Sequence, residues 1–250
     1  MKFSIITSTY NAEKYLERLL ASVFCQTYPY YEIIVQDGAS TDNTVELLKK
    51  HLPQGNWRSE PDAGIYDAWN KALARASGDW AIFLGADDCL MGENVLVRCS
   101  HHLRRLPGNI MFAYGALAKG KDGAISSLGN RPLLDIYRRF SANMGLPFPA
   151  TFIRMTLAKE HKFDTNYKIA GDFDFAATHI THDNIVRIPV VVSYMEQGGI
   201  STNTTAQKLL LEERGRVLRK RILPKAQELV LGCIKHYMNE DAMLECQDAV

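Results

Sequence analysis

An α/β fold with a mostly parallel central sheet, helices on both faces and further helices at the C-terminus is predicted by three features of the sequence. In residues 1–90, short apolar segments alternate with segments whose apolar residues recur at helical spacing. Each of the main apolar segments ends in a cluster of polar residues. The last part of the chain, from about Ala206, again has a helical pattern. Alternating strands and helices are typical of a parallel sheet with helical crossovers.

The first half of the chain contains four predicted strands, at residues 3–7, 32–36, 56–59 and 80–84. We expect Asn11 to cap the first helix and either Ser40 or Thr41 to cap the second. The third helix should end at Gly78, because glycine commonly follows a helix C-terminus. Its apolar residues recur at i, i+3, i+4, i+7, i+8 and i+11: Ile65, Ala68, Trp69, Ala72, Leu73 and Ala76.

The second half is less regular. We predict a β-hairpin over residues 111–119 and 124–128, a loop region over 130–149, a helix over 173–181 and a strand over 185–194. The C-terminal helical segment should break at Pro224, which cannot donate a backbone hydrogen bond.

Composition excludes some classes of protein. The chain has 250 residues, of which 46% are hydrophobic and 23% charged, as in ordinary globular proteins. Its net charge of +1 does not indicate nucleic-acid binding. The five cysteines are widely spaced, which argues against a disulfide framework or a zinc site. Because we find neither a signal peptide nor a membrane-spanning run, we expect a cytoplasmic protein, either soluble or peripheral to a membrane.

Three polar clusters follow the predicted strands. They are Ser8-Thr9, Asp37-Gly38 and Asp87-Asp88. In a parallel sheet, ligands bind outside the carboxyl ends of the strands, so these clusters predict a binding site. The glycine pattern of dinucleotide-binding folds is absent after the first strand, and so is the P-loop pattern.

The adjacent carboxylates Asp87 and Asp88 predict a metal site. Two neighbouring carboxylates repel each other, and a cation usually offsets that cost. Mg²⁺ or Mn²⁺ prefers oxygen ligands and commonly bridges a carboxylate to substrate phosphates. Taken alone, the pair also fits a capping aspartate beside a solvated one, and Asp37 also fits a turn with Gly38.

Four motifs together are more specific. They are SIITSTYN at residues 4–11, EIIVQDGASTD at 32–42, EPDAGIYDAWNK at 60–71 and GDWAIFLGADD at 78–88. In this order and spacing the chain resembles the family 2 glycosyltransferases, which have the GT-A fold. Two shorter matches follow, AGD at residues 170–172 and GGIS at 198–201. The most similar subgroup builds bacterial surface polysaccharide or O-antigen repeats, as in lipopolysaccharide.

The resemblance implies a nucleotide-sugar site, with UDP as the expected nucleotide. Ser8, Thr9 and Asp37 would hold the base and ribose, with Asp37 accepting a hydrogen bond from a pyrimidine N–H. Asp62 and Gly64 would border the same pocket. Ala86 and Asp87 would contact the ribose-diphosphate, and Asp87 and Asp88 would hold Mn²⁺ or Mg²⁺. The family's D-x-D motif is broken, because its first position is Gly85 here.

The same resemblance implies that Asp172 is the general base of an inverting transfer. A carboxylate there would remove the proton of the acceptor hydroxyl as it attacks the anomeric carbon. Asp172 also fits a helix N-cap, and Asp174 is a nearby competitor. Many relatives have His-Gln shortly before this region, whereas this chain has Phe148-Pro149.

A basic stretch near the C-terminus offers a membrane contact. Its basic residues alternate with apolar ones and no acidic residue interrupts them: Arg214, Arg216, Arg219, Lys220, Arg221 and Lys225. This pattern fits a helix on an anionic membrane surface, at the inner face of the cytoplasmic membrane. It also fits a helix packed on the domain with a solvated basic face.

We therefore predict a metal-dependent inverting glycosyltransferase. It would move a sugar from a nucleotide diphosphate to a carbohydrate acceptor, such as a polyprenyl-diphosphate-linked saccharide. Residues 1–204 would be the catalytic domain, with a nucleotide-sugar half (1–100) and an acceptor half (101–204), and 205–250 a helical extension. One alternative is a sugar-phosphate nucleotidyltransferase, which would need an Arg-containing glycine-rich loop that this chain lacks. The other is a non-enzyme, either a sugar-nucleotide sensor or an inactive subunit of a transferase pair.

Overall fold

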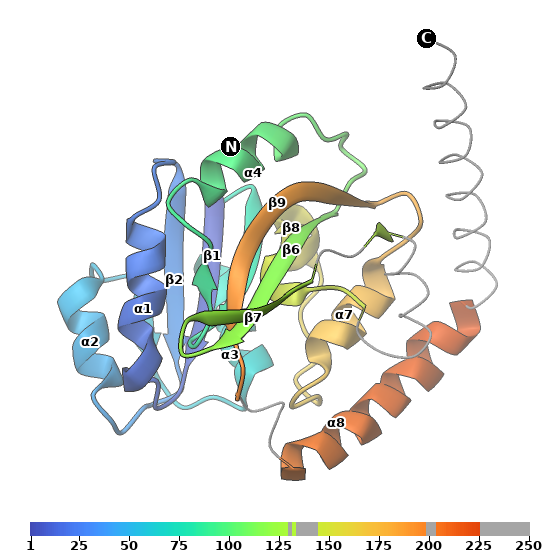
Figure 1. Ribbon diagram of the computed structural model, residues 1–250. Helices are drawn as coiled ribbons and strands as arrows, with labels where there is room; N and C mark the ends of the chain where they lie inside the picture. The colour runs from blue at the N-terminus through green and yellow to red at the C-terminus, as the bar shows by residue number, and fades with distance from the viewer. Residues whose placement is uncertain (130–131, 134–144, 199–203, 226–250) are drawn as a thin grey trace.

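The computed structural model describes residues 1–129, 132–133, 145–198 and 204–225 (Figure 1). Its first half alternates strands and helices as the sequence predicts. The elements are β1 (Phe3–Thr9), α1 (Glu13–Phe24), β2 (Tyr31–Asp37), α2 (Thr44–His51), β3 (Trp57–Ser59), α3 (Ile65–Arg75) and β4 (Trp80–Gly85).

The second half is less regular, with strands that range from 2 to 12 residues. Its elements are β5 (Cys89–Leu90), α4 (Val95–Leu103), β6 (Phe112–Lys121), β7 (Ala124–Gly129), η1 (Phe148–Ala150), β8 (Thr151–Arg154), α6 (Met155–Glu160), α7 (Gly171–His179) and β9 (Ile185–Glu196). The predicted hairpin is β6–β7, which pair antiparallel, and the predicted helix and strand after it are α7 and β9. Most of the predicted loop at 130–149 lies outside the described residues.

All strands of the described residues belong to one sheet with the order β3-β2-β1-β4-β8-β6-β9-β5, and β7 pairs with β6. The strands β3, β2, β1 and β4 are parallel neighbours. β8 then runs antiparallel to both β4 and β6, and β9 is parallel to β6. The parallel part of the sheet is thus the half whose strands carry the polar clusters.

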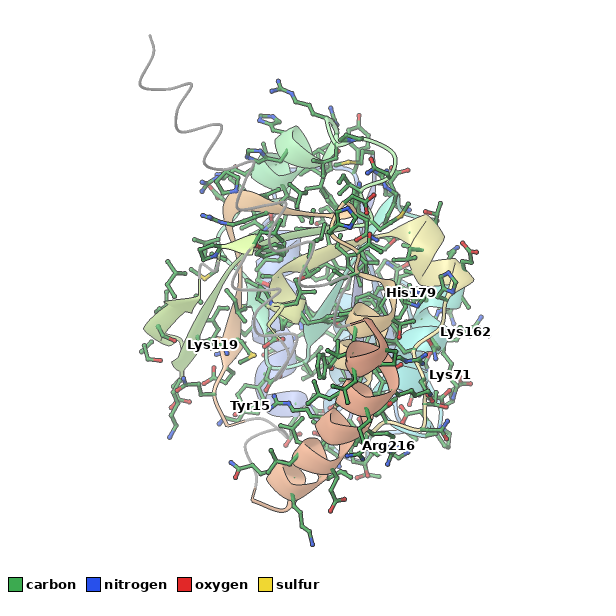
Figure 2. The ribbon with its side chains drawn as sticks, turned by 90° about the vertical axis from the view of Figure 1, so that its right-hand side faces the viewer. Tyr15, Lys71, Lys119, Lys162, His179 and Arg216 are labelled. Atoms are coloured by element: carbon green, nitrogen blue, oxygen red, sulfur yellow. The ribbon has the colours of Figure 1, made fainter. Side chains whose placement is uncertain are left out.

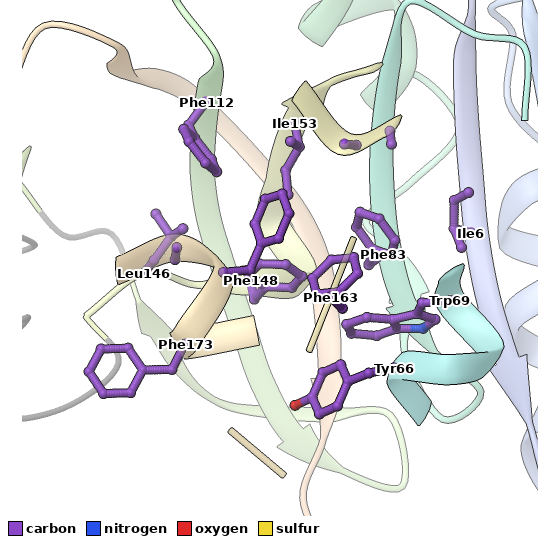
Figure 3. Packing of buried hydrophobic residues seen from close by; sticks show 14 of the residues in the cluster. Ile6, Tyr66, Trp69, Phe83, Phe112, Leu146, Phe148, Ile153, Phe163 and Phe173 are labelled. Carbon is purple, nitrogen blue, oxygen red and sulfur yellow. The ribbon is translucent and has the colours of Figure 1, made fainter. Parts of the chain in front are cut away.

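Each face of the sheet has its own core. Ile5, Ile33 and Ile82 are paired across β2, β1 and β4 and lie in the cluster covered by α1, α2 and α4. The next residue of each strand points to the opposite face, as strand geometry requires, and there Ile6 and Phe83 pack with residues of α3, α6 and α7. Aromatic rings dominate this second core (Figure 3): Tyr66, Trp69, Phe83, Phe148, Phe163 and Phe173.

Three predicted helix ends are wrong. Asn11 does not cap α1: it has φ 48° and its side chain accepts a hydrogen bond from Thr41 N, so α1 begins at Glu13. Neither Ser40 nor Thr41 caps α2, because Asp42 accepts from Thr44 N and the helix starts there. The third helix ends at Arg75, before Gly78, whose close approach to Ser4 explains the glycine instead.

The described part of the C-terminal segment, residues 204–225, is helical and lies beside α7 (Figure 1). It comprises α8 (Thr204–Val217), a π-helical turn η3 (Leu218–Ile222) and a 3₁₀ turn η4 (Leu223–Lys225). The α-helical pattern changes at Leu218, before Pro224, so the break comes earlier than predicted. Val217 and Ile222 are buried in the aromatic core, which fixes this segment to the sheet domain.

Candidate active site

The carboxyl ends of β1, β2 and β4 place the predicted polar clusters side by side. Thr9 is paired with Asp37 across β1 and β2, and Ser8 is paired with Gly85 across β1 and β4. Ser8 is half-buried and Thr9 is buried. The edge predicted from the sequence therefore exists, and the turn with Asp87 and Asp88 continues from it.

Asp37 is fully buried at the end of β2, where its carboxylate accepts four hydrogen bonds. Thr9 Oγ1 and Ser40 Oγ donate to Oδ1 at 2.8 and 2.5 Å, and Ser59 Oγ and Ser40 N donate to Oδ2 at 2.7 and 2.9 Å. These contacts join the ends of β1, β2 and β3 and the loop after β2. The contact between Asp37 and a pyrimidine stays a prediction, and it requires one of these hydroxyls to turn away.

The loop between β3 and α3 brings Asp62 over the end of β2. Oδ1 of Asp62 accepts from Gly64 N at 2.8 Å, and Oδ2 lies 2.7 Å from where a Cβ on Gly38 would be. A side chain at Gly38 would displace this carboxylate. Gly64 has φ 120°, which L-residues with a side chain rarely adopt. Both glycines thus allow the loop to fold against the strand ends, with Asp62 half-buried.

Asp87 and Asp88 lie in a turn directly after β4, closed by Asp88 N donating to Gly85 O at 3.1 Å. Both carboxylates converge on Gly85: a Cβ there would be 2.8 Å from Asp87 Oδ1 and 3.1 Å from Asp88 Oδ2. Asp87 and the neighbouring Ala86 are half-buried, whereas Asp88 is 4% exposed. Burial and the charge of Asp87 raise the pKa of Asp88 to about 8.

This pair fits a divalent metal ion by its donor chemistry. Burial raises the pKa of both converging carboxylates, so both gain from a cation, and both offer the oxygen ligands that Mg²⁺ and Mn²⁺ prefer. Within the described residues there is no group of three or more His, Cys, Asp or Glu side chains that could hold a metal. Diphosphate oxygens and water would have to complete the coordination, which is the usual arrangement for Mg²⁺.

Arg18 and Glu196 support this turn, and the sequence analysis missed both. Arg18 on α1 donates from Nη2 to the backbone oxygen of Asp87 at 2.6 Å. Its Nη1 lies 2.6 Å from Oε2 of Glu196, at the end of β9. The only sequence signal is that Glu196 lies two residues before the GGIS motif.

Asp172 lies in the first turn of α7, where Tyr66 from the start of α3 reaches it. Tyr66 Oη is 3.2 Å from Asp172 Oδ1 and donates to Ile169 O at 2.7 Å. The Tyr66 ring (Figure 3) packs on Gly171, where a Cβ would come within 2.7 Å of ring carbons. Burial raises the pKa of Asp172 to about 6, against the hydrogen bonds from Phe173 N and Tyr66. Because α3 begins at the carboxyl edge, Tyr66 places Asp172 at that edge too.

Asp174, the competitor of Asp172, has another role in this structure. Its carboxylate is 4% exposed and receives two hydrogen bonds from Arg221 of η3, Nε to Oδ1 at 3.0 Å and Nη2 to Oδ2 at 3.3 Å. Such a fork-shaped ion pair is typical of Arg with a carboxylate. The pair joins α7 to the C-terminal segment.

The basic stretch packs partly on the domain. Besides Arg221, Arg216 lies over the Tyr167 ring at 5.4 Å, and Lys220 lies 3.9 Å from Asp164. Figure 2 looks onto α8, which carries Arg216 on the near face of the molecule. Arg216, Arg219 and Lys220 are still exposed, and so are the flanking Leu211 and Leu223. The side chain of Lys225 lies outside the described residues.

None of the helices in the described parts of the chain is both long and apolar enough to cross a bilayer.

The carboxyl edge of the sheet thus carries polar side chains at the ends of β1 and β2, and Asp87 and Asp88 follow the end of β4. Residues 4–154 match the family described as "Glycosyl transferase family 2", and the chain belongs to this family. It is therefore a glycosyltransferase, as the motifs predicted.

Curated proteins with similar sequences are also named glycosyltransferases. A "PGL/p-HBAD biosynthesis glycosyltransferase" of Mycobacterium bovis is 30% identical over 222 residues, which cover 84% of this chain and 82% of the relative. An "Uncharacterized glycosyltransferase" of Mycobacterium tuberculosis is 34% identical over 177 residues, which cover 69% of this chain and 66% of the relative.

Solved structures show the same fold. Residues 1–349 of S. aureus TarS in complex with UDP-GlcNAc align with TM-score 0.68 and 20% identity, covering 91% of this chain and 69% of that one. The mannosyltransferase PcManGT from Pyrobaculum calidifontis, in complex with GDP-Man and Mn²⁺, aligns with TM-score 0.65 and 20% identity, covering 91% and 68%. The predicted GT-A fold is thereby confirmed.

Proposed function

We propose that this glycosyltransferase inverts the anomeric carbon of a UDP-sugar and transfers the sugar to a hydroxyl of a carbohydrate acceptor. The observation that carries the proposal is the contact between Tyr66 and Asp172. It puts a half-buried carboxyl with a pKa near 6 on the edge where Asp62, Asp87 and Asp88 lie. A carboxyl with this pKa is largely ionised at neutral pH and still basic enough to accept a proton.

The donor would lie along the strand ends. Ser8, Asp62 and Gly64 would border the base and ribose. Thr9 and Asp37, which are buried, would shape the same pocket from the side of the sheet. Ala86 and Asp87 would contact the ribose-diphosphate. TarS has been solved with UDP-GlcNAc and PcManGT with GDP-Man, so the nucleotide must be tested directly.

Asp87 and Asp88 would hold Mn²⁺ or Mg²⁺. A bound divalent ion supplies positive charge that stabilises the departing diphosphate. Two other residues position these carboxylates. Arg18 fixes the backbone of Asp87, and Gly85 leaves room for both carboxylates.

In the transfer, Asp172 takes the proton of the acceptor hydroxyl. The hydroxyl oxygen forms a bond to the anomeric carbon as the bond from that carbon to the diphosphate oxygen breaks, and the electron pair leaves with the diphosphate. One such displacement inverts the configuration, so an α-linked donor gives a β-linked product. Tyr66 and Phe173 N fix the orientation of the Asp172 carboxylate.

The acceptor class we propose is a polyprenyl-diphosphate-linked saccharide in surface-polysaccharide or O-antigen synthesis. Such a substrate stays at the inner face of the cytoplasmic membrane, so the enzyme would work there as a cytoplasmic, peripheral protein. The exposed Arg216, Arg219 and Lys220 beside Leu211 and Leu223 support a contact with that surface. We keep residues 1–204 as the proposed catalytic domain and 205–250 as its helical extension.

The test is a thermal-shift and donor-hydrolysis panel of UDP-, GDP- and dTDP-sugars with Mn²⁺ or with EDTA. We expect UDP-sugars with Mn²⁺ to stabilise the protein most and to be hydrolysed slowly. Equal stabilisation by GDP and UDP would refute the uridine assignment, and full turnover in excess EDTA would refute the metal role. Donor binding without any turnover, on any acceptor, would favour the sugar-nucleotide sensor.

A further inference from the structure

Glu213 of α8 is a buried carboxylate with an unusual set of partners. Glu213 is only 1% exposed. Oε1 accepts a hydrogen bond from Lys168 N at 2.7 Å, and Oε2 accepts from both Ile169 N and Ala170 N at 2.9 Å. One side chain from the C-terminal segment thus binds three consecutive backbone N–H groups.

Those three residues lead directly into the turn that carries Asp172. Ala170 is the residue before α7, and Asp172 is the second residue of the helix. On its other side the same loop is fixed by Tyr66, which donates to Ile169 O at 2.7 Å and whose ring packs on Gly171. The loop is therefore held between α3 and α8, with Asp172 at its end.

The chemistry of this clamp is specific to a carboxylate. A buried charge is costly unless hydrogen bonds satisfy it, and hydrogen bonds from backbone N–H groups to a carboxylate are about twice as strong as neutral ones. A glutamine offers only one acceptor oxygen, and its NH₂ group would face a donor. An alanine would leave all three N–H groups without this partner, so the loop would lose its fixed position.

We propose that Glu213 is a positioning residue for the base Asp172, so that the C-terminal helix α8 is part of the catalytic apparatus. This inference rests on the proposed function of Asp172 as the base. The Asp172 carboxylate is contacted by the Tyr66 hydroxyl from α3 and by Phe173 N, and the charge of Arg214 on α8, the neighbour of Glu213, acts to lower its pKa. Hence α8 acts on Asp172 twice, through the loop and through the charge of Arg214.

The first measurement compares Glu213→Gln and Glu213→Ala with the wild type and with Glu212→Ala, a matched control because Glu212 is the exposed neighbour on the same helix. Hydrolysis of UDP-glucose and UDP-N-acetylglucosamine is followed with Mn²⁺, and UDP affinity is measured by calorimetry. We expect Glu213→Ala to lower kcat about 100-fold, as for misplacement of a catalytic group by an ångström. UDP affinity should be unchanged in all variants.

The second measurement separates positioning from simple loss of stability. The ¹³Cγ signal of Asp172, identified by its loss in Asp172→Asn, is titrated in each protein. In the wild type we expect a pKa near 6. In both Glu213 variants the pKa should fall toward the ordinary value of an aspartate, because water reaches a loosened loop and a negative charge is removed. The Glu212→Ala control should leave it unchanged.

The outcomes are distinct. Lower kcat with unchanged UDP affinity and a lowered Asp172 pKa supports the proposal. If folded Glu213 variants keep kcat within about twofold of wild type, or if the Asp172 pKa does not move, the proposal is wrong. Should Glu213→Ala not fold, Glu213→Gln decides, since it keeps the volume of the side chain. If Asp172→Asn itself turns over normally, the base assignment fails instead, whatever the Glu213 variants do.

Discussion

Nη1 of Arg18 lies 2.6 Å from Oε2 of Glu196, and this ion pair connects α1 with the end of β9. The Glu196 side chain is only 3% exposed and also accepts a hydrogen bond from Asp122 N, in the turn of the β6–β7 hairpin. Since Arg18 donates to Asp87 O as well, one guanidinium fixes the turn that carries both proposed metal ligands.

Replacing Arg18 by methionine should destabilise the fold and weaken metal binding. The change leaves the Glu196 carboxylate without its cation, and because the Arg18 side chain is itself 32% exposed, the cost should lie below the ~3 kcal/mol of a fully buried pair. Urea unfolding measures the first effect, and the Mn²⁺ concentration needed for UDP-sugar hydrolysis measures the second. Lys14→Met, at an exposed position of the same helix, is the control.

The double variant Arg18→Met with Glu196→Gln should recover part of the lost stability, because the unpaired charge is gone. If Arg18→Met unfolds at the same urea concentration as Lys14→Met, the ion pair does not hold the turn.

Substitutions at Asp172 and at Asp174 should have different effects on kcat. Asp172→Asn should spare UDP binding and reduce kcat about 10²–10⁴-fold, the usual loss of a general base. The wild-type kcat should rise with pH through an apparent pKa of about 6 and level off above it, because the base acts only when ionised. Asp174→Asn should keep this pH profile. A near-normal kcat in Asp172→Asn together with a large loss in Asp174→Asn would show that the base is Asp174.

Asp172→Asn should also make the protein more stable at neutral pH. The pKa of Asp172 is raised from 3.8 to about 6, so the folded protein binds this proton more tightly than the unfolded chain does. That contribution to stability is complete below about pH 4 and is lost as pH rises through about 6. Asparagine is neutral throughout, so its Tm should exceed that of wild type at pH 7.5 and approach it at pH 4.5.

Asp174→Asn is the matched control for this measurement. It should lower Tm at pH 7.5, because Arg221 loses its bidentate partner. If Asp172→Asn lowers Tm as much as Asp174→Asn does, Asp172 has a structural role that outweighs the cost of its charge.

The sheet edge could be predicted from the sequence because its signals are local. Apolar runs that end in Thr9, Asp37 and Asp87 define strands and their polar ends, and parallel pairing then brings these ends together. Helix ends were less predictable, since Asn11 bonds to Thr41 across the site and not to its own helix.

The supporting residues could not be predicted, because their partners are distant in the sequence. Glu213 binds a loop 43 to 45 residues away, and Tyr66 meets Asp172 across 106 residues. Neither residue differs in local pattern from other residues of an amphipathic helix. The double role of the basic stretch was hidden for the same reason: Arg221 reaches Asp174 only once α7 and η3 pack together.

The exposed part of that stretch is the remaining candidate for membrane contact. Leu211 and Leu223 are 68% and 65% exposed, which is high for leucine. Arg219 and Lys220 lie between them along the chain and are exposed as well. Arg221, by contrast, pairs with Asp174 and must be left intact in any test.

Changing Arg219 and Lys220 together to Gln should therefore weaken binding to anionic vesicles without harming the fold. Each Lys or Arg near an anionic surface contributes about 1 kcal/mol, so two substitutions should reduce partitioning about 30-fold at low salt. Sedimentation with phosphatidylglycerol and with phosphatidylcholine vesicles measures this, and high salt should abolish the difference because it screens the charges. The variant should keep the Tm and the UDP-sugar hydrolysis of the wild type.

Arg104→Gln with Arg105→Gln, at the end of α4, is the control of equal charge change. If the two double variants partition alike, general charge and not this helix attracts the protein to the membrane. If neither they nor the wild type sediment with anionic vesicles, the basic stretch is only a solvated helix face.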